Sequence, residues 1–312
     1  MMITIVPDVH GNTFWKEAQV NLGKGPIVFL GDFLDPYYED SILYDVTPES
    51  AIENFRQILE FKRSHPDDVV LLLGNHDLEY LYGKGVCDCR CDDKRYVEIQ
   101  ELFRDNSNSD LFQLAAEYMV AGKRYIFTHA GLHPQWLNMH FRNWQTDTIV
   151  SLLNKRHKRA LAAKSPDGSA FGRALAERDP ERGGYFECGS PVWADAEILN
   201  EKKEKLEDVI QIVGHTRIQD GGPVMTDSVI FTDCQKVLVL DDRGVLRFVD
   251  GEMCKNQYAD PFHPDREPDK SFDYDCFGRP FCRRCGSHKV YIYAGMFTNN
   301  YHCQKCHIRD FL

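Results

Sequence analysis

Five short motifs in this chain carry side chains of the kind that bind divalent metal ions, and each motif contains a glycine. In sequence order the motifs are Asp8-Val9-His10-Gly11-Asn12, Gly31-Asp32-Phe33-Leu34-Asp35, Gly74-Asn75-His76-Asp77, Thr128-His129-Ala130-Gly131 and Gly214-His215-Thr216. Four of the five directly follow an apolar, β-branched run. Carboxylate and amide oxygens combined with imidazoles suit divalent cations. A sheet could therefore deliver these ligands to one metal site from the ends of its strands.

The ligand set suits the hydrolysis of a phosphate ester. This reaction needs a nucleophile made from water and an offset for the charge on the phosphoryl group, and two divalent metals supply both. The candidate ligands are Asp8, His10, Asp32, Asn75, His129 and His215. Asp8 and His10 lie two residues apart, and an extended chain would place them on one face. Each residue alone is equally a turn former, but the shared order and strand context favour the metal site.

The elements that position these motifs follow from the apolar pattern. Short apolar runs predict strands at 3–6, 27–30, 69–73 and 125–128. Helical patterns occur at 13–22, 48–64, 94–104 and 109–119. Because strands and helices alternate, the sequence predicts an α/β sheet with helices on its faces.

The second half of the chain has a different pattern. A helical insertion is expected within about 133–190, with its clearest helix at 146–164. Strand-like runs then follow at 209–213, 224–226, 229–232, 237–240 and 245–249, with a tight turn at 242–244. This spacing predicts a mixed pair of sheets rather than one parallel sheet. A catalytic domain is therefore expected over residues 1–258.

The C-terminal region reads as a separate module. Residues 259–275 form an acidic, proline-containing linker, and residues 276–312 are basic. Two Cys-x2-Cys pairs lie in the basic tail: Cys282 with Cys285, and Cys303 with Cys306. This is the spacing of a structural zinc ribbon, and a bound zinc ion would supply the folding energy that so short a tail lacks.

Two further features leave alternatives open. The basic and aromatic ribbon could contact nucleic acid or an acidic protein surface, or it could serve only for docking or stability. Cys87, Cys89 and Cys91 form an alternating series soon after Asn75. Since alternate residues of an extended chain point to opposite sides, free thiols are favoured there over a metal or redox site.

Composition excludes several classes of protein. The formal charge is −11, which argues against generic binding along nucleic-acid backbones. No apolar run is long enough to span a bilayer, and the segment before the first motif is too short for a signal peptide. A cytoplasmic protein without membrane contact is expected, and its 11 cysteines are then expected to be thiols or zinc ligands.

The motif set resembles the calcineurin-like metallophosphoesterase superfamily over about residues 1–250. Its motifs read D-x-H, G-D-x-x-D, G-N-H-[DE], H-[AG]-G and G-H-x. The last motif here lacks the second histidine of the G-H-x-H form, and Ser190-Pro191-Val192-Trp193-Ala194-Asp195 precedes it. Both features are similar to the phosphoprotein-phosphatase branch, including its bacterial and phage members. The resemblance implies a double β-sheet sandwich flanked by helices, in α/β/β/α order.

The resemblance also implies roles for individual residues. Asp8 and His10 would bind one metal ion, Asp32 would bridge, and the second ion would take the remaining ligands: Asn75, His129 and His215. The ions would be manganese, iron or zinc, and a hydroxide bridging them would attack phosphorus. His76 would be the general acid, oriented by Asp35 or, less favoured, by Asp77.

Two departures from the family pattern concern phosphate binding. The phosphatase branch has an arginine after the second Asp of G-D-x-x-D, where this chain has Pro36. A second arginine expected before Gly214 is also missing from 196–213. Arg217 is the first candidate to replace them, followed by Arg173 and Arg182.

Three functions fit the sequence. The leading hypothesis is a phosphomonoesterase of the serine/threonine protein phosphatase type, acting on a phosphoprotein or a nucleotide. The missing arginines and the basic tail motivate a dinucleoside polyphosphate hydrolase or nucleic-acid phosphodiesterase with the same metal site. A non-enzymatic, metal-stabilised binding protein is the third.

Overall fold

The computed structural model divides the chain into two compact units, Met1–Tyr258 and Ala259–Leu312. It describes residues 1–37, 45–87, 89–105, 107–162, 169–200, 205–218 and 222–254, and the short strands 272–274, 280–282, 290–294, 299–303 and 309–311. No helix among the described residues is both long and apolar enough to cross a membrane.

The first sheet of the larger unit has six strands in the order β11-β10-β1-β2-β3-β4. Their bounds are β1 (Ile3–Val6), β2 (Ile27–Phe29), β3 (Val69–Leu72), β4 (Phe112–Gln113), β10 (Leu238–Leu240) and β11 (Leu246–Phe248). The strands from β1 to β4 are parallel, whereas β10 is antiparallel to β1. Every residue of β1 and β2 is buried, as expected for parallel strands covered on both faces.

The second sheet has five strands in the order β5-β6-β7-β9-β8. Their bounds are β5 (Ala115–Val120), β6 (Lys123–Thr128), β7 (Val209–Val213), β8 (Val224–Met225) and β9 (Val229–Phe231). Here β6, β7 and β9 are parallel, and β5 and β8 are antiparallel to their neighbours. The two mixed sheets confirm the α/β prediction and the prediction of a sheet pair.

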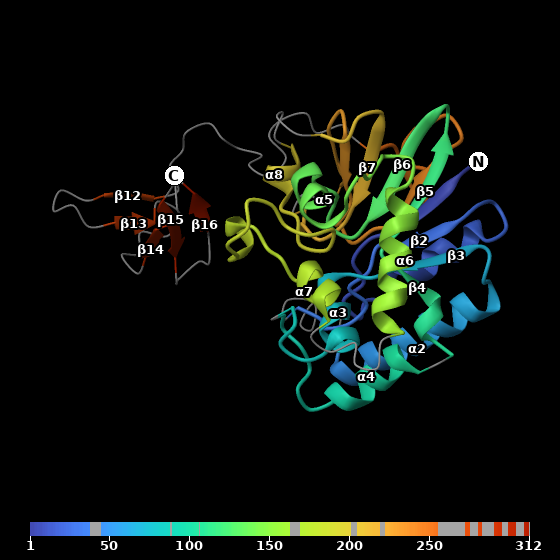
Figure 1. The fold of residues 1–312 in the computed structure, drawn as a ribbon, viewed down its shortest axis with the longest axis horizontal. Coiled ribbons are helices and arrows are strands. Elements are labelled where there is room, and N and C mark those ends of the chain that lie inside the picture. The colour runs from blue at the N-terminus through green and yellow to red at the C-terminus, as the bar shows by residue number, and fades with distance from the viewer. Residues whose placement is uncertain are drawn as a thin grey trace. The chain divides into compact units, whose positions relative to one another are not determined.

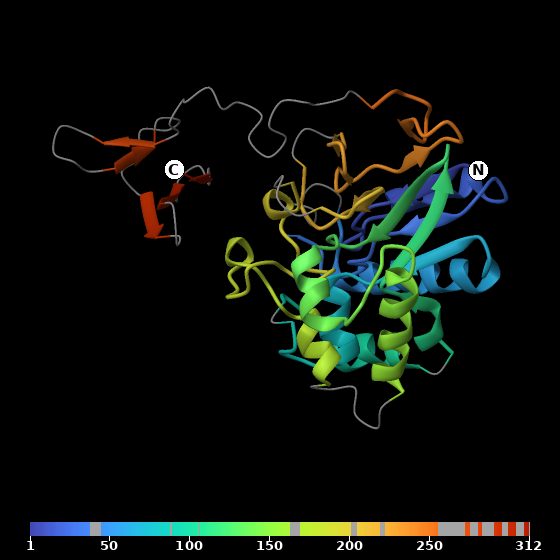
Figure 2. The same ribbon diagram turned by 45° about the horizontal axis from the view of Figure 1, so that its top comes forward.

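Helices of the larger unit gather beside the sheets, and α2, α4 and α6 lie on the same side of the sheets (Figures 1 and 2). The helical elements are η1 (Phe14–Asn21), α2 (Pro48–Ser64), α3 (Asn75–Tyr82), α4 (Tyr96–Arg104), η2 (Ser109–Leu111), α5 (Pro134–His140), α6 (Ile149–Leu161), α7 (Ala170–Leu175), η3 (Pro180–Arg182) and α8 (Ala196–Asn200). Thr47 and Ser50 form a capping box at the start of α2, and Pro48 occupies its first turn. The helix predicted at 48–64 is confirmed.

The helix predicted at 109–119 is wrong. The chain there forms η2, β4 and most of β5. Phe112 pairs with Leu71 in the first sheet, and Ala116 pairs with Phe127 in the second. Cross-strand pairing and burial of this kind outweigh local helix propensity, which is a weak preference by comparison.

The smaller unit contains only antiparallel pairings among its described strands. β12 (Phe272–Tyr274) pairs with β13 (Pro280–Cys282), and β14 (Val290–Ala294), β15 (Asn299–Cys303) and β16 (Arg309–Phe311) form a second sheet. Two of the four predicted zinc ligands, Cys285 and Cys306, lie outside the described residues, as does most of the acidic linker.

A buried imidazole lies between α3 and α6. The hydroxyl of Tyr82 lies 2.9 Å from Nδ1 of His157. Burial lowers the pKa of His157 to about 3 and raises that of Tyr82, so both groups are neutral near pH 7. The hydrogen bond between Tyr82 and His157 therefore joins two neutral groups.

His157 is expected to make the protein less stable in mild acid, because the unfolded chain binds a proton there and the folded chain does not. The free energy of unfolding should fall by about 1.4 kcal/mol per pH unit below the ordinary histidine pKa of about 6.5. Urea denaturation from neutral pH to about pH 4.5 should show a slope that is smaller by about 1.4 kcal/mol per pH unit in His157→Phe than in the wild type, because other buried histidines contribute equally to both. Equal slopes in the two proteins would contradict the assignment.

Candidate functional site

The predicted ligands lie at the carboxyl ends of neighbouring strands. Asp8 follows β1, Asp32 follows β2, Asn75 begins α3 just after β3, His129 follows β6, and His215 follows β7. Ends of parallel strands meet at one edge of a sheet, and ligands are commonly bound there. The structure thus brings together residues that are far apart in the sequence.

The chain around His10 is not extended, contrary to the sequence-based expectation. The strand ends at Val6, and His10 adopts a left-handed conformation with φ +44°. The backbone N–H of His10 donates to the carbonyl of Asp32 at 2.7 Å. Asp8 and His10 therefore reach the same cluster through a turn that is fixed by the neighbouring motif.

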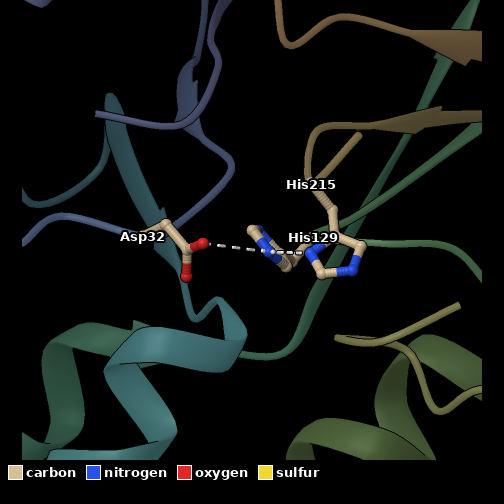
Figure 3. A group of neighbouring side chains, drawn as sticks. All are labelled: Asp32, His129 and His215. Carbon is tan, nitrogen blue, oxygen red and sulfur yellow. Dashed lines mark hydrogen bonds and ion pairs between the residues drawn. The ribbon is translucent and has the colours of Figure 1, made fainter. Parts of the chain in front are cut away.

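Two groups of potential metal ligands share one carboxylate. Oxygen or nitrogen atoms of Asp8, His10 and Asp32 all lie within 4.8 Å of one another. The same is true of Asp32, His129 and His215, whose side chains converge in Figure 3. Asp32 belongs to both groups, which is the position expected of a carboxylate that bridges two metal ions.

Hydrogen bonds fix the orientation of two of these imidazoles. Nδ1 of His10 donates to the carbonyl of Leu34 at 2.9 Å, and Nδ1 of His129 donates to that of Leu30 at 2.8 Å. In the neutral rings, Nε2 then presents a lone pair toward the site. Nε2 of His129 lies 2.9 Å from Oδ1 of Asn75. A lone pair facing an acceptor oxygen is repulsive unless a cation lies between them.

Burial keeps the histidines in the form that binds metals. It lowers the pKa of His10 to about 4, and it lowers those of His129 and His215 below the ordinary value. Burial alone would raise the pKa of Asp32, but His129 and other imidazoles hold it below its usual range. Nε2 of His215 is buried and has no hydrogen-bond partner in the described part of the chain. Neutral imidazoles around an ionised carboxylate, with one nitrogen left unpaired, fit bound divalent metal ions.

His76 lies beside this cluster and is paired with a carboxylate. Its Nδ1 lies 3.2 Å from Oδ2 of Asp35 and 3.0 Å from the carbonyl oxygen of Arg90. The other oxygen of Asp35 accepts from the hydroxyl of Tyr80 at 2.6 Å, and that hydroxyl accepts from the backbone N–H of Asp92. Asp35 is thus held in place by a second layer of hydrogen bonds.

The sequence offered Asp77 as an alternative partner of His76, but in the structure Asp77 binds backbone amides. Its two oxygens accept backbone N–H groups of Asp32, Phe33 and Gly74 at 2.7–3.0 Å. The carboxylate therefore ties the second motif to the third. Its oxygens are engaged by backbone amides, and Asp35 is the partner that the structure gives to His76.

Arginines approach the site from two segments. Arg217 lies over the ring of Tyr37, with its guanidinium carbon 5.2 Å from the ring centroid. Arg182 donates to the hydroxyl of Thr216 at 2.6 Å and pairs with Asp195 at 2.8 Å. After burial, the charge of Arg182 is the largest cause lowering the pKa of His215. Arg173 lies in α7.

Three residues near the ligands were not found by sequence reasoning. Asp233 is buried and, after burial itself, is the main group raising the pKa of Asp8. It follows β9, a parallel neighbour of β7, so the strand-end pattern could have found it. Tyr37 lies edge-on to His10, with ring centroids 4.7 Å apart, and Arg90 stacks on Tyr37. The spacing of residues in the sequence gives no signal for Tyr37 or Arg90.

Comparison with known proteins places the chain in a family. It matches the profile of the calcineurin-like phosphoesterase family over residues 1–223. The chain belongs to this family, as its motifs predict.

The curated relatives include protein phosphatases. The chain is 24% identical over 150 residues to the serine/threonine-protein phosphatase 4 catalytic subunit of Kluyveromyces lactis, covering 44% of this chain and 41% of that protein. The corresponding subunit of Eremothecium gossypii is 25% identical over 144 residues, covering 42% and 39%. The chain thus spans about two-fifths of the length of these relatives.

Two solved phosphatase structures align with most of the chain. A cold-active protein-tyrosine phosphatase from a psychrophilic Shewanella species has a TM-score of 0.48 and 18% identity, covering 80% of this chain and 78% of that one. A Saccharomyces cerevisiae serine/threonine phosphatase with similarity to human PP5 has a TM-score of 0.45 and 16% identity, covering 84% and 83%.

A substitution at Gly214 tests whether these ligands bind metal. A Cβ at this residue would overlap Oδ1 of Asp8, whereas at Gly222 it would meet only the ring of Phe248, at 3.8 Å. Gly214→Ala should weaken manganese binding by roughly 10- to 100-fold, as is typical of changes that displace a ligand. Gly222→Ala is the matched control. Titration calorimetry with manganese measures both variants, and equal affinities would contradict the assignment.

Proposed function

We propose that this protein hydrolyses phosphate monoesters in the manner of a serine/threonine protein phosphatase. The observation that carries the proposal is the His76–Asp35 ion pair, which lies beside two ligand groups sharing Asp32. The backbone N–H of His76 donates to Oδ1 of Asp32 at 3.0 Å, so this pair and the ligands form one assembly. Bound divalent ions would supply Lewis acidity and lower the pKa of water.

His76 is positioned to protonate the leaving oxygen. Asp35 and the carbonyl of Arg90 engage Nδ1, which leaves Nε2 available to substrate. Burial opposes a charge on His76, but Asp32 and Asp35 raise its pKa above the ordinary value. The imidazolium therefore persists near neutral pH, as a general acid requires.

The leaving group distinguishes a general acid from a structural histidine. With manganese, His76→Asn should lower kcat by about 10²- to 10⁴-fold on phosphoserine peptides. The loss should be much smaller on p-nitrophenyl phosphate, because nitrophenolate leaves without a proton. His65→Asn, at the end of α2, is the control. Equal losses on both substrates would contradict the acid role.

Asp35→Asn tests the orienting carboxylate through the pH profile. Removing Asp35 removes one of the charges that raise the pKa of His76. The general acid must be protonated to act. The fall in activity at high pH should therefore begin at a lower pH in Asp35→Asn than in the wild type. Steady-state rates on a phosphoserine peptide across neutral pH measure the shift. An unchanged profile would assign Asp35 a different role.

A second candidate keeps the metal ligands and changes the substrate. Pro36 stands where the phosphatase branch has an arginine, and the tail from 276 to 312 is basic. These features favour a dinucleoside polyphosphate or a nucleic acid as substrate. Rates on a phosphopeptide, diadenosine tetraphosphate and single-stranded RNA decide between the candidates, and a strong preference for the phosphopeptide excludes the second.

We also propose one structural zinc ion in the smaller unit. Cys282 ends β13 and Cys303 ends β15, so each Cys-x2-Cys pair begins where a strand ends. Cys282→Ser in the full chain should remove about one zinc per molecule, whereas Cys254→Ser should not. Metal analysis by mass spectrometry measures this, and an unchanged zinc content would contradict the proposal. A contact with nucleic acid or an acidic protein surface is proposed on the basic charge of residues 276–312 alone.

A further inference from the structure

The segment from Cys89 to Asp92 contacts both the third motif and the residues that hold Asp35. Sγ of Cys89 lies 3.3 Å from Nδ2 of Asn75, and the carbonyl of Arg90 contacts His76. The backbone N–H of Asp92 donates to the tyrosine hydroxyl that contacts Asp35. None of the five motifs includes this segment. Its backbone nevertheless contacts the candidate general acid directly.

The side chain of Arg90 occupies the space beside Pro36. Its Nη1 donates to the carbonyl of Pro36 at 3.2 Å, and its Nη2 donates to the carbonyl of Asp35 at 2.6 Å. The guanidinium carbon lies 4.1 Å from the centroid of the Tyr37 ring. A planar cation is thus fixed by two carbonyls and one aromatic face.

The guanidinium of Arg90 lies one aromatic ring away from the ligand cluster. Tyr37 contacts His10 through its ring edge, so Arg90 is separated from His10 by one aromatic ring. Arginine has five N–H donors, and the two carbonyls take two of them. The side chain as a whole is exposed. Remaining donors can therefore reach an anion that enters from solvent.

We propose that Arg90 binds the phosphoryl oxygens of the substrate on the His76 side of the site, and this rests on the proposed phosphomonoesterase function. Pro36 offers no side-chain donor, and the guanidinium of Arg90 bonds to its carbonyl. Arg90 thereby supplies a cation beside position 36. A planar fork of donors matches two non-bridging phosphate oxygens.

Arg90 also gives a preference among substrates. A phosphate monoester carries two negative charges and three terminal oxygens near neutral pH, whereas a diester carries one charge and two such oxygens. A forked cation at the edge of the site therefore favours the monoester dianion. Substitution of Arg90 should reduce the rate on monoesters more than the rate on diesters.

Phosphate binding tests Arg90 without relying on turnover. Arg90→Gln retains an amide that can reach the carbonyls but removes the charge. Arg243→Gln, in the β10–β11 turn, is the matched control. In the full chain loaded with manganese, Arg90→Gln should raise the Kd for inorganic phosphate by roughly 10- to 100-fold, as expected for a lost charge-assisted hydrogen bond. Titration calorimetry measures Kd in both variants.

Kinetics separates phosphate binding from a structural role. Arg90→Gln should lower kcat/KM by a similar factor on p-nitrophenyl phosphate and on a phosphoserine peptide, because the carbonyl that contacts His76 is retained. Arg90→Lys should recover part of the phosphate affinity, since it restores the charge without the fork. Wild-type phosphate affinity in Arg90→Gln would overturn the proposal. So would a lost affinity accompanied by a much larger loss of kcat/KM on the peptide than on p-nitrophenyl phosphate and no recovery in Arg90→Lys.

The two proposals fail in different ways. A wild-type protein that binds phosphate through Arg90 but hydrolyses no monoester refutes the proposed function and leaves the binding role intact. An active wild type whose phosphate affinity does not depend on Arg90 refutes only the inference about Arg90.

Discussion

The position of the Asp32 carboxylate is the constraint on which the whole site depends. Oδ1 accepts the backbone N–H of His76, and Oδ2 lies 3.6 Å from Nε2 of His10 and 3.5 Å from that of His129. Asp32 adopts a left-handed φ of +51°, and Asp77 accepts its backbone N–H. One side chain thereby links both ligand groups and the candidate acid. A small shift of this residue would disturb all three.

The fold buries several carboxylates close together at the ends of apolar strands. Burial and the nearby carboxylates of Asp233 and Asp32 raise the pKa of Asp8 well above its ordinary value. Uncompensated buried carboxylates are costly, and divalent cations remove that cost. The buried residues of β1 and β2 stabilise the sheet, while their following turns carry the ligands. Metal binding and the stability of these turns are therefore coupled.

The ligand scaffold and the substrate contacts come from different kinds of structure. The ligands follow strands whose register fixes them, whereas Arg90 and Arg182 come from segments outside regular sheets. Such segments vary readily without disturbing a core. Under the proposal for Arg90, a cation from such a segment completes the phosphate site even though position 36 is proline. The candidate metal ligands depend on the strands, and the arginines beside them depend on the connecting segments.

Local patterns predicted the strands that precede the ligands, the helix Pro48–Ser64 and the family, because burial periodicity, helix caps and strand-end motifs can be recognised within short stretches of sequence. The same patterns misassigned 109–119, since pairing with β3 and β6 determines the structure of that segment. The turn of His10 onto Asp32 and the position of Arg90 against Pro36 became visible in the folded chain alone. These are hydrogen bonds between residues distant in sequence, and no local pattern specifies which backbone carbonyl a distant side chain will meet.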